Sequence, residues 1–431
     1  MASPADDPCV KAQQHFLFVT GPLHGHINPV QRLAARVLAA NPGARVTFST
    51  AVSGHRAPAH IPVPRAAQRG DGGVLHAPYS DGYDDGFDPS AHDARLYRAR
   101  TRDADRASLA AVVARLRPTV TRVAYTFLVA WALDVARDAG VPAALYWIQP
   151  ATVFAVYHRV LHGGGHGDAL AAACAGGGSV ELPGLPALTA DALPSIVSAA
   201  SPEHPMHGAF QSFRDLFVDL DENRPRVLVN TFEALEPEAL RAVPELEVVA
   251  VGPAVPDEAS LSPRTTDDTT EDYMAWLDTK AARSVVYVSF GSFGAAGRGD
   301  EARPGCHRPA VPMGATKQDD EKEQEGMVVA WCEQVRVLSH PAVGCFVTHC
   351  GWNSALESMA CGVPIVALPH WTDQPTVAWL LAERAGVGVR ACAVAGDGVV
   401  ESGELQRCVE AVMGDGQCAA DIFSMNLEFR I

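Results

Sequence analysis

Short apolar runs alternate with segments of helical periodicity along most of the chain. Continuous apolar runs at residues 15–20 and 46–50 are typical of buried strands in a parallel sheet. Between them, apolar residues recur at helical spacing from Val30 to Leu38, and a Pro-Gly pair at 42–43 ends that helix. Further strands are predicted at residues 120–125, 143–147, 226–230, 248–251, 284–290, 343–347 and 365–368, and further helices at 109–116, 129–139, 237–242 and 401–413. This order of elements predicts an α/β fold.

The length of the chain, 431 residues, exceeds what one hydrophobic core usually supports, so two domains are expected. A polar, proline-rich stretch at residues 254–272 is typical of an interdomain linker. We therefore predict a first domain at 1–252, a linker at 253–272 and a second domain at 273–431. Within the second domain, residues 295–325 and 414–431 are atypical.

The segment that follows the first predicted strand carries a candidate general base. Asn28 and Pro29 have the pattern of an N-cap and first-turn pair, which predicts a loop at residues 21–27. Such a loop lies in the usual ligand crevice of an open α/β sheet. His26, within it, could accept a proton as a neutral imidazole, or could merely bind backbone groups. A metal pair with His24 is rejected, because no further ligands follow at metal spacing.

Residues 331–374 combine polar side chains with two apolar strands. The strand at 343–347 is followed by a polar loop at 348–353. Ser354 and Glu357 have the spacing of a capping box, which predicts that a helix begins at Ser354, and the residues from Gly362 onward predict its end. A loop that leads into a helix N-terminus binds anions in such units. The pattern therefore predicts a ligand that carries phosphate.

Charge and composition narrow the possible partners. The chain has 34 Lys and Arg against 50 Asp and Glu, a formal charge of −16, which argues against nucleic acid and anionic membranes. Ten cysteines without a CxxC pair suit reduced thiols in a cytosol. With no apolar run of 18 residues and no apolar segment at the N-terminus, we expect a cytoplasmic protein without membrane insertion. A nicotinamide-dependent oxidoreductase is disfavoured, because no G-x-G-x-x-G turn follows the first strand.

At nearly every defining position, residues 331–374 resemble the signature box of plant family 1 UDP-dependent glycosyltransferases, which act on secondary products. The resemblance implies the GT-B fold, with two Rossmann-like domains facing a cleft. It implies inverting transfer of glucose from UDP-glucose to a hydroxyl or carboxyl of a small apolar plant metabolite. The binding partners would be the UDP-sugar and the acceptor, and the protein would act as a monomer without a cofactor or metal.

The same resemblance assigns roles to individual residues. In the segment GHINP, His26 would be the catalytic base. Trp331 would stack on uracil, and Gln334 and Glu357 would bind ribose. His349, Asn353 and Ser354 would hold the diphosphate, and Trp352, Asp373 and Gln374 would face the sugar. Trp331 could instead be a core aromatic residue, and Glu357 only a capping partner. The full donor-binding set is Ser292, Trp331, Cys332, Gln334, His349, Trp352, Asn353, Ser354, Glu357, Asp373 and Gln374.

On the acceptor side, the resemblance points to Thr126, Trp147 and Gln149. Many relatives have Asp where this chain has Thr126, and that carboxylate would orient the catalytic histidine. The segment YSDGYDDGFD resembles the subgroup that glucosylates anthocyanins at the 5-hydroxyl, or carboxylates such as auxin (indole-3-acetate).

Two segments depart from the family pattern. Residues 295–315 contain several prolines and no apolar period, so they cannot form the helix that a β-α-β unit needs there. If the gene is read one nucleotide later over part of this segment, the translated sequence resembles that of the family. The alternative hypothesis is therefore a catalytically impaired or inactive homologue, whose gene is damaged or wrongly read. The tail at 414–431 also ends without the further helices of relatives.

Overall fold

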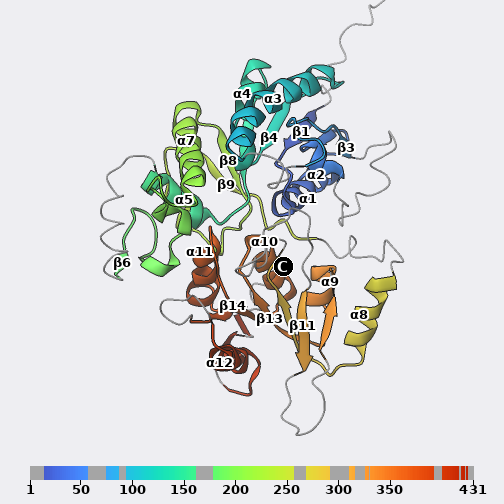
Figure 1. Cartoon of the computed structure of the whole chain (residues 1–431), viewed down its shortest axis with the longest axis vertical. Coiled ribbons are helices and arrows are strands. Elements are labelled where there is room, and N and C mark those ends of the chain that lie inside the picture. Colours follow the sequence, from blue (N-terminus) through green and yellow to red (C-terminus); the bar gives the residue numbers. More distant parts are fainter. Residues whose placement is uncertain are drawn as a thin grey trace, which may run out of the picture. The chain divides into compact units, whose positions relative to one another are not determined.

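The chain forms two compact units, Met1–Tyr146 and Trp147–Ile431. The structure is a computed structural model and describes residues 14–56, 74–86, 94–161, 178–256, 268–291, 310–315, 326–329, 331–392, 400–416, 419–422 and 424–425. Both units contain strands and helices (Figure 1). Within this part of the chain, no helix is long and apolar enough to cross a membrane.

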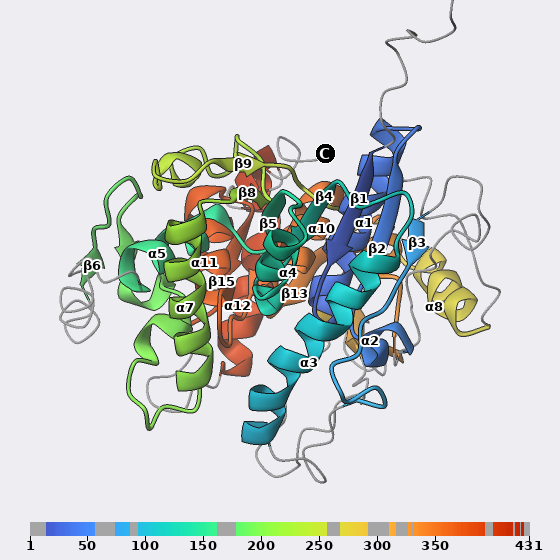
Figure 2. The ribbon, with the colours of Figure 1, turned by 90° about the horizontal axis from the view of Figure 1, so that it is seen from above.

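The first unit is built on parallel strands in the order β3-β2-β1-β4-β5. Apolar side chains of the central strand β1, such as Leu17 and Val19, are fully buried, as the continuous apolar pattern predicts. Helices α1 and α3 are long, and Figure 2 shows them with the strands from above. The bounds are β1 His15–Val19, α1 His24–Ala40, β2 Arg45–Ser49, α2 Val52–Arg56, β3 Val74–His76, α3 Ala94–Arg115, β4 Arg122–Tyr125, η2 Phe127–Val129, α4 Ala132–Asp138 and β5 Ala143–Trp147.

Helix α1 begins earlier than the sequence predicts. Its first residue is His24 and its N-cap is Leu23, so Pro29 lies inside the helix and not in its first turn. Proline removes one helical hydrogen bond, which the N-terminal part of a helix tolerates best. Backbone N–H groups of His26 and Ile27 both donate to Leu23 O, at 2.8 and 2.9 Å. His26 is therefore held by the first turn of a helix, and the prediction that it lies in a loop is wrong.

The second unit opens with an aromatic core after β5. Trp147 is fully buried, and its ring meets Phe154, Tyr157, Phe213 and Phe217 at centroid distances of 5.3 to 6.2 Å. These rings come from α5 and α7, two helices that the sequence analysis did not predict. The elements of this part are α5 Ala151–Leu161, β6 Ser179–Val180, β7 Leu188–Thr189, η3 Ala190–Ala192, η4 Ser195–Ser198, α7 His207–Asn223, β8 Arg226–Val229, η5 Ala239–Arg241 and β9 Val248–Ala250.

Glu236 is a buried carboxylate at the N-terminus of α5. It accepts hydrogen bonds from the backbone N–H groups of Ala151 (3.0 Å) and Thr152 (2.8 Å), and from the hydroxyls of Thr152 and Thr231. Burial raises the pKa of Glu236, and the four hydrogen bonds oppose that rise. Glu236 supplies an acceptor to the free amides of the helix start from 85 residues away, so it joins α5 to the segment after β8.

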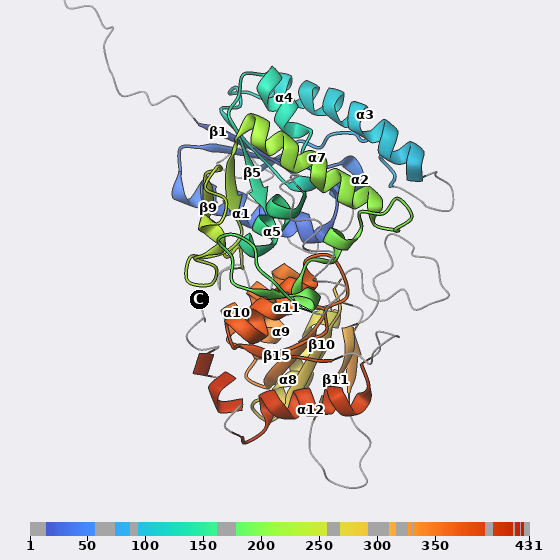
Figure 3. The same ribbon diagram turned by 90° about the vertical axis from the view of Figure 1, so that its left-hand side faces the viewer.

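A second sheet, also in the second unit, has the order β12-β11-β10-β13-β14-β15. All residues of β13 are buried, and α12 packs along β13, β14 and β15 (Figure 3). This confirms the predicted strands at 343–347 and 365–368 and the predicted helix at 401–413. The bounds are α8 Asp268–Asp278, β10 Val285–Ser289, β11 Ala310–Ala315, β12 Met327–Val329, α9 Gln334–Leu338, β13 Val343–Thr348, α10 Trp352–Cys361, β14 Ile365–Ala367, α11 Gln374–Trp379, the π-helical turn Leu380–Arg384, β15 Gly388–Arg390 and α12 Ser402–Met413.

Strand β11 departs from the parallel pattern of its sheet. It runs antiparallel to both β10 and β12, and its register with β10 shifts between Val286 and Val288. Pro312 lies within it and lacks the N–H group that a strand ladder needs. The segment expected to lack a helix falls mostly on residues 292–309, which lie outside the described residues. The predicted linker includes the start of α8, and the domain bounds as a whole stay a prediction.

Helix α3 carries a buried carboxyl group, Asp105, near a second one, Asp81. Burial, followed by the charge of Asp81, raises the pKa of Asp105 to about 7. Its Oδ1 atom has no hydrogen-bond partner within the part of the chain that the structure describes. An acid whose pKa is higher in the folded state stabilises the fold fully below its unfolded pKa. That stabilisation is lost as pH rises from about 4 to about 7.

Asp105→Asn is therefore expected to stabilise the protein at neutral pH and to change little near pH 4. The gain at pH 8 should be about 1–2 kcal/mol, less than the full shift implies because solvent screens part of it. Urea unfolding at both pH values measures it. Asp103→Asn, at an exposed position of the same helix, is the matched control. An equal gain at both pH values would show that ionisation of Asp105 is not the cause.

Candidate active site

The loop between β13 and α10 presents a helix N-terminus. The N-cap of α10 is Gly351, with extended dihedrals, and no side chain caps the helix. The first three helical residues are Trp352, Asn353 and Ser354, whose N–H groups lack partners within the helix. The predicted capping box is therefore wrong, because the helix begins two residues before Ser354. A Cβ at position 351 would lie 2.6 Å from the His349 ring, so a side chain at this N-cap would displace the ring.

Ser354 and Glu357 take part in a different contact. The side-chain amide of Gln334 donates to Ser354 Oγ at 3.0 Å and to Glu357 Oε2 at 2.7 Å. Gln334 is the first residue of α9, whereas the other two belong to α10. The structure thus brings together three of the residues predicted to bind the donor. Glu357 does not cap the helix. Its carboxylate belongs instead to a polar cluster with Gln334 and Ser354.

Trp331 and Cys332 precede this cluster. Trp331 is 38% exposed, which contradicts the alternative that it is a core aromatic residue. Cys332 is buried, and burial raises the pKa of its thiol to about 11. The Tyr287 hydroxyl lies 3.2 Å from Cys332 Sγ and 3.4 Å from Gln334 Oε1. Tyr287, which the sequence analysis missed, therefore supports two donor-side residues from β10. A lone tyrosine in an apolar strand was the available signal.

His349 is enclosed by two glycines. A Cβ at Gly291 would lie 2.7 Å from the imidazole, and Gly291 has a φ of +71°, which also favours glycine. Burial, followed by the nearby His370, lowers the pKa of His349 to about 4, and a hydrogen bond with the Ser289 backbone opposes this. His349 is therefore neutral at physiological pH and can act as a hydrogen-bond donor to an anion. Ser292, which the sequence analysis also assigns to the donor-binding set, lies outside the described residues.

Residues 370–374 form a tightly bonded turn. Gln374 Oε1 accepts from the backbone N–H groups of His370 (2.9 Å) and Trp371 (3.1 Å). Asp373 is 7% exposed, and burial, the largest influence, raises the pKa of its carboxyl to about 6.

Trp352 is buried, and its indole N–H donates to the backbone carbonyl of Asn230 at 2.7 Å. That N–H group is thus bound to backbone and is not available to a sugar hydroxyl.

The first unit holds His26, the predicted base. Its ring lies edge-on to Phe127 at 4.7 Å, and its Nδ1 is buried without a hydrogen-bond partner among the residues described. Burial lowers the pKa of His26 to about 3. Thr126 is fully buried, and its hydroxyl lies 3.1 Å from the Thr20 hydroxyl. Thr126 thus pairs with another threonine, and the imidazole is neutral at physiological pH.

The two other acceptor-side residues differ from each other. Trp147 lies in the aromatic core, and its indole N–H donates to Pro150 O at 3.1 Å. The structure therefore gives Trp147 a packing role. Gln149 is partly buried, and its side chain, near Asp373, opposes the rise that burial causes in the pKa of that carboxyl. One predicted acceptor-side residue thus lies near a predicted donor-side residue.

Comparison with known proteins identifies the chain. Residues 203–425 match the family described as UDP-glucoronosyl and UDP-glucosyl transferase. UDP-glycosyltransferase 75C1 of Solanum lycopersicum is 40% identical to the chain, over 94% of this chain and 91% of that protein. Anthocyanidin 3-O-glucoside 5-O-glucosyltransferase 1 of Perilla frutescens is 38% identical over the same shares. The chain belongs to the plant family 1 UDP-glycosyltransferases.

Solved structures agree with this assignment. The crystal structure of Os79 from O. sativa in complex with UDP matches with a TM-score of 0.74 and 28% identity, over 96% of this chain and 94% of that one. The fold is GT-B. The resemblance seen in residues 331–374 is thereby confirmed at the level of the family, while the roles of single residues in this transferase stay predictions.

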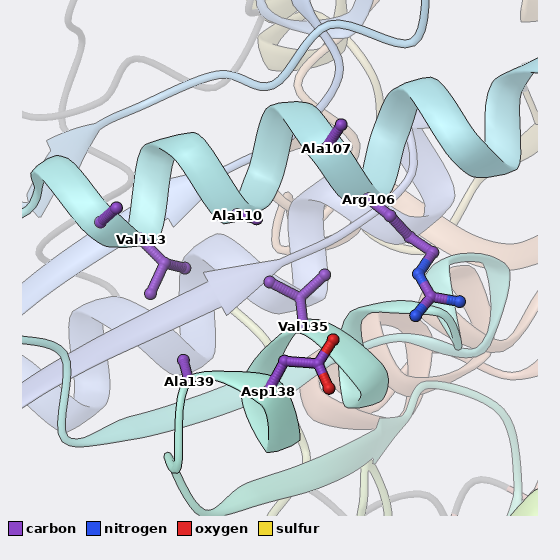
Figure 4. A pocket seen from close by; sticks show the side chains of 8 residues that line it. Arg106, Ala107, Ala110, Val113, Val135, Asp138 and Ala139 are labelled. Carbon is purple, nitrogen blue, oxygen red and sulfur yellow. The ribbon is translucent and has the colours of Figure 1, made fainter.

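A groove between α3 and α4 of the transferase contains none of the predicted site residues (Figure 4). Its volume is about 390 Å³. Arg106, at its rim, forms an ion pair of 3.0 Å with Asp134, and so joins the two helices. The groove is lined by Arg106, Ala107, Ala110, Val113, Ala114, Val135, Asp138 and Ala139. Its lining is mostly small and apolar, with Arg106 and Asp138 as its charged residues.

Proposed function

We propose that this UDP-glycosyltransferase transfers glucose from UDP-glucose to a hydroxyl or carboxyl of a small apolar plant metabolite. The observation that carries the proposal is the cluster of Gln334, Ser354 and Glu357, together with the exposed Trp331 three residues before Gln334. An aromatic face suits uracil, and a carboxylate with an amide suits the two ribose hydroxyls. The names of several relatives describe glucosyl transfer to anthocyanidin glucosides, phloretin and crocetin.

The diphosphate would be held at the start of α10. Backbone N–H groups of the first turn and the neutral His349 can donate to phosphate oxygens, and the helix dipole favours negative charge there. As the bond between glucose and UDP breaks, negative charge grows on the leaving group. Donors fixed in place before the reaction stabilise that charge. We therefore propose that this enzyme needs neither a metal ion nor another cofactor.

For a hydroxyl acceptor, His26 would take the proton as the acceptor oxygen attacks the anomeric carbon. Attack from the face opposite UDP converts an α-linked donor to a β-glucoside, and UDP leaves with the electron pair of the broken bond. The low pKa of His26 keeps it unprotonated and ready, but makes it a weak base until its cation is stabilised. A weak base suits acidic acceptors, such as phenols. A carboxylate acceptor has no proton to lose.

The proposal is tested by measuring UDP release. Purified full-length chain is mixed with UDP-glucose and with each member of a panel of flavonoids, anthocyanidins and auxin-like acids. We expect acceptor-dependent release of UDP and a new glucoside of matching mass with at least one acceptor. No release with any acceptor, under conditions in which the tomato relative is active on its own acceptor, would overturn the proposal.

The antiparallel strand β11 favours a second candidate, an impaired homologue. An internal strand that contains proline lacks one N–H group of the ladder, and this weakens the sheet that positions β10 and Gly291. The same assay separates the two candidates. If the sequence as printed releases no UDP, and a variant with the restored reading frame over residues 302–314 does, the impaired homologue is the correct description.

We also propose that the protein is a cytoplasmic monomer. The relative from Gardenia jasminoides, 38% identical over 95% of this chain, is described as chloroplastic, so location differs among related enzymes or needs a signal outside the shared region. Size-exclusion chromatography of the purified chain and microscopy of a fluorescent fusion in plant cells test the two parts separately. A dimer in the first, or plastid fluorescence in the second, would contradict them.

A further inference from the structure

The turn at residues 370–374, which carries Asp373 and Gln374, is bonded to a distant segment of the same compact unit. Ser195, the first residue of η4, forms a reciprocal pair of hydrogen bonds with Thr372. The Ser195 N–H donates to Thr372 O at 2.8 Å, and Ser195 Oγ accepts from the Thr372 N–H at 2.7 Å. Both backbone groups of Thr372 are thus bound by one residue, which lies 177 positions earlier in the chain.

Thr372 has a backbone conformation that needs such support. Its φ is +54°, in the left-handed region that residues with a β-branched side chain rarely adopt. A strained residue of this kind persists only where its surroundings hold it, so without Ser195 the turn would relax toward another conformation. The Thr372 hydroxyl also donates to Asp373 Oδ1 at 2.9 Å. The conformation of Thr372 therefore determines the position of the neighbouring carboxylate.

Two further contacts join the same segments. The Thr376 hydroxyl in α11 donates to Ala192 O at 2.7 Å, and both residues are buried. Arg390, at the end of β15, bonds to Asp191 through its backbone oxygen (2.9 Å) and its carboxylate (2.8 Å). Ser195 thus belongs to a segment, residues 191–195, that has contacts of its own with the helix after the turn and with β15.

Gln374 shows how the conformation of the turn affects the groups that a sugar would meet. Its Oε1 accepts from the backbone N–H groups of His370 (2.9 Å) and Trp371 (3.1 Å), so both lone pairs of this oxygen are used. A ligand would therefore meet the amide N–H groups of Gln374, which donate, and the carboxylate of Asp373, which accepts. A donor next to an acceptor suits neighbouring hydroxyls of a hexose, because each hydroxyl can do both.

We propose that Ser195 is a positioning residue for donor recognition, which acts through Thr372 to hold the turn in the conformation that presents Asp373 and Gln374 to the glucosyl group. This inference rests on the proposed function, because it takes UDP-glucose as the donor. It assigns the task to a residue that lies outside residues 331–374 and that needs no contact with the sugar itself.

Calorimetry with UDP-glucose and with UDP, on the full chain without an acceptor, measures this role. All measurements are made at one pH of about 8, where the terminal phosphate of UDP is ionised. Uridine and the diphosphate are common to the two ligands. The change in the ratio of the two dissociation constants, from wild type to variant, therefore reports on the glucosyl group.

Ser195→Ala removes the acceptor of the Thr372 N–H. We expect it to weaken UDP-glucose binding about five- to tenfold and to leave UDP binding unchanged within about twofold. Ser195→Thr keeps the hydroxyl and should restore the affinity of the wild type. Ser198→Ala is the matched control. Ser198 Oγ bonds to Ser195 O at 2.8 Å inside η4, so this variant loosens η4 but keeps the pair with Thr372, and it should change neither affinity.

A second substitution tests whether Ser195 acts through the strained residue. Asparagine adopts positive φ values several times more readily than most other residues, so a turn with Thr372→Asn needs less support. In that background, adding Ser195→Ala should weaken UDP-glucose binding only about twofold. A role of Ser195 that does not pass through Thr372 would give the same loss in both backgrounds.

Three results would overturn the role of Ser195: unchanged UDP-glucose affinity in Ser195→Ala, equal weakening of both ligands, or an undiminished effect in the Thr372→Asn background. If Ser195→Ala does not fold, as judged by circular dichroism, Ser195→Cys decides, because its sulfur is a weak acceptor in a side chain of similar shape. None of these results depends on transfer to an acceptor. A wild-type chain that binds UDP but not UDP-glucose would instead contradict the proposed function, and this inference with it.

Discussion

Replacing His26 by alanine is expected to lower kcat about 10²- to 10⁴-fold with a hydroxyl acceptor, while the affinity for UDP-glucose stays unchanged. The imidazole is neutral at working pH and sits on the first turn of α1, so it can take the proton from the attacking oxygen. The donor residues all belong to the other compact unit. Steady-state kinetics with a flavonoid acceptor, and calorimetry with UDP-glucose, measure the two quantities.

The same variant should behave differently with a carboxylate acceptor. An auxin-like acid is already ionised at pH 7, so loss of the base should lower kcat about tenfold or less. His24→Ala, in the same turn of α1, is the matched control and should retain activity with both acceptors. Equal losses with hydroxyl and carboxylate acceptors would show that His26 does not act as the base.

Replacing Glu236 by alanine is expected to destabilise the protein by about 3–5 kcal/mol. Four donors, two of them backbone amides at the start of α5, would lose their buried acceptor together. Glu236→Gln keeps one acceptor oxygen, so a smaller loss of about 1–2 kcal/mol is expected. Urea unfolding followed by circular dichroism gives both values.

Glu233→Ala is the control for the Glu236 variants. Glu233 lies three residues earlier, is 61% exposed and pairs with Arg241 at the surface. Exposed ion pairs contribute about 1 kcal/mol or less, so this variant should unfold nearly as the wild type does. If Glu236→Ala and Glu233→Ala lower stability equally, the buried carboxylate has no special part in holding α5.

The strands were predictable from sequence because continuous apolar runs fill both faces of a parallel sheet. The starts of the helices were harder to predict from sequence. Asn28-Pro29 and Ser354 with Glu357 have the local pattern of helix starts, yet α1 and α10 both begin earlier. In α10, tertiary contacts determine the roles of the two residues that resemble a capping box, because Gln334 of another helix binds both Ser354 and Glu357. Local capping rules cannot include a partner that is distant in the sequence.

Helix α5 was missed because nearly every one of its residues is buried, so few polar side chains mark an exposed face in its sequence. The start of α5 is capped by Glu236, far along the chain, and not by a neighbouring residue. Helix α7, in contrast, has buried apolar residues at helical spacing, and its pattern predicts a helix that the sequence analysis did not include. Apart from Ser292, the residues predicted to bind the donor lie within 44 consecutive positions, so a local pattern was enough to indicate them. Tyr287 could not be indicated in this way, because its contacts with Cys332 and Gln334 depend on the folded arrangement.

Asn230 has a mechanical consequence for donor binding. Its backbone carbonyl accepts from Trp352 at the start of α10, and its side-chain oxygen accepts from the Ala254 N–H at 2.7 Å. All these groups are buried, so pulling either bond apart would expose unpaired polar atoms at a cost of about 1–3 kcal/mol each. The end of β8, the chain after β9 and the first turn of α10 therefore move together as one rigid group. A hinge that admits UDP-glucose has to bend the backbone somewhere other than at this asparagine.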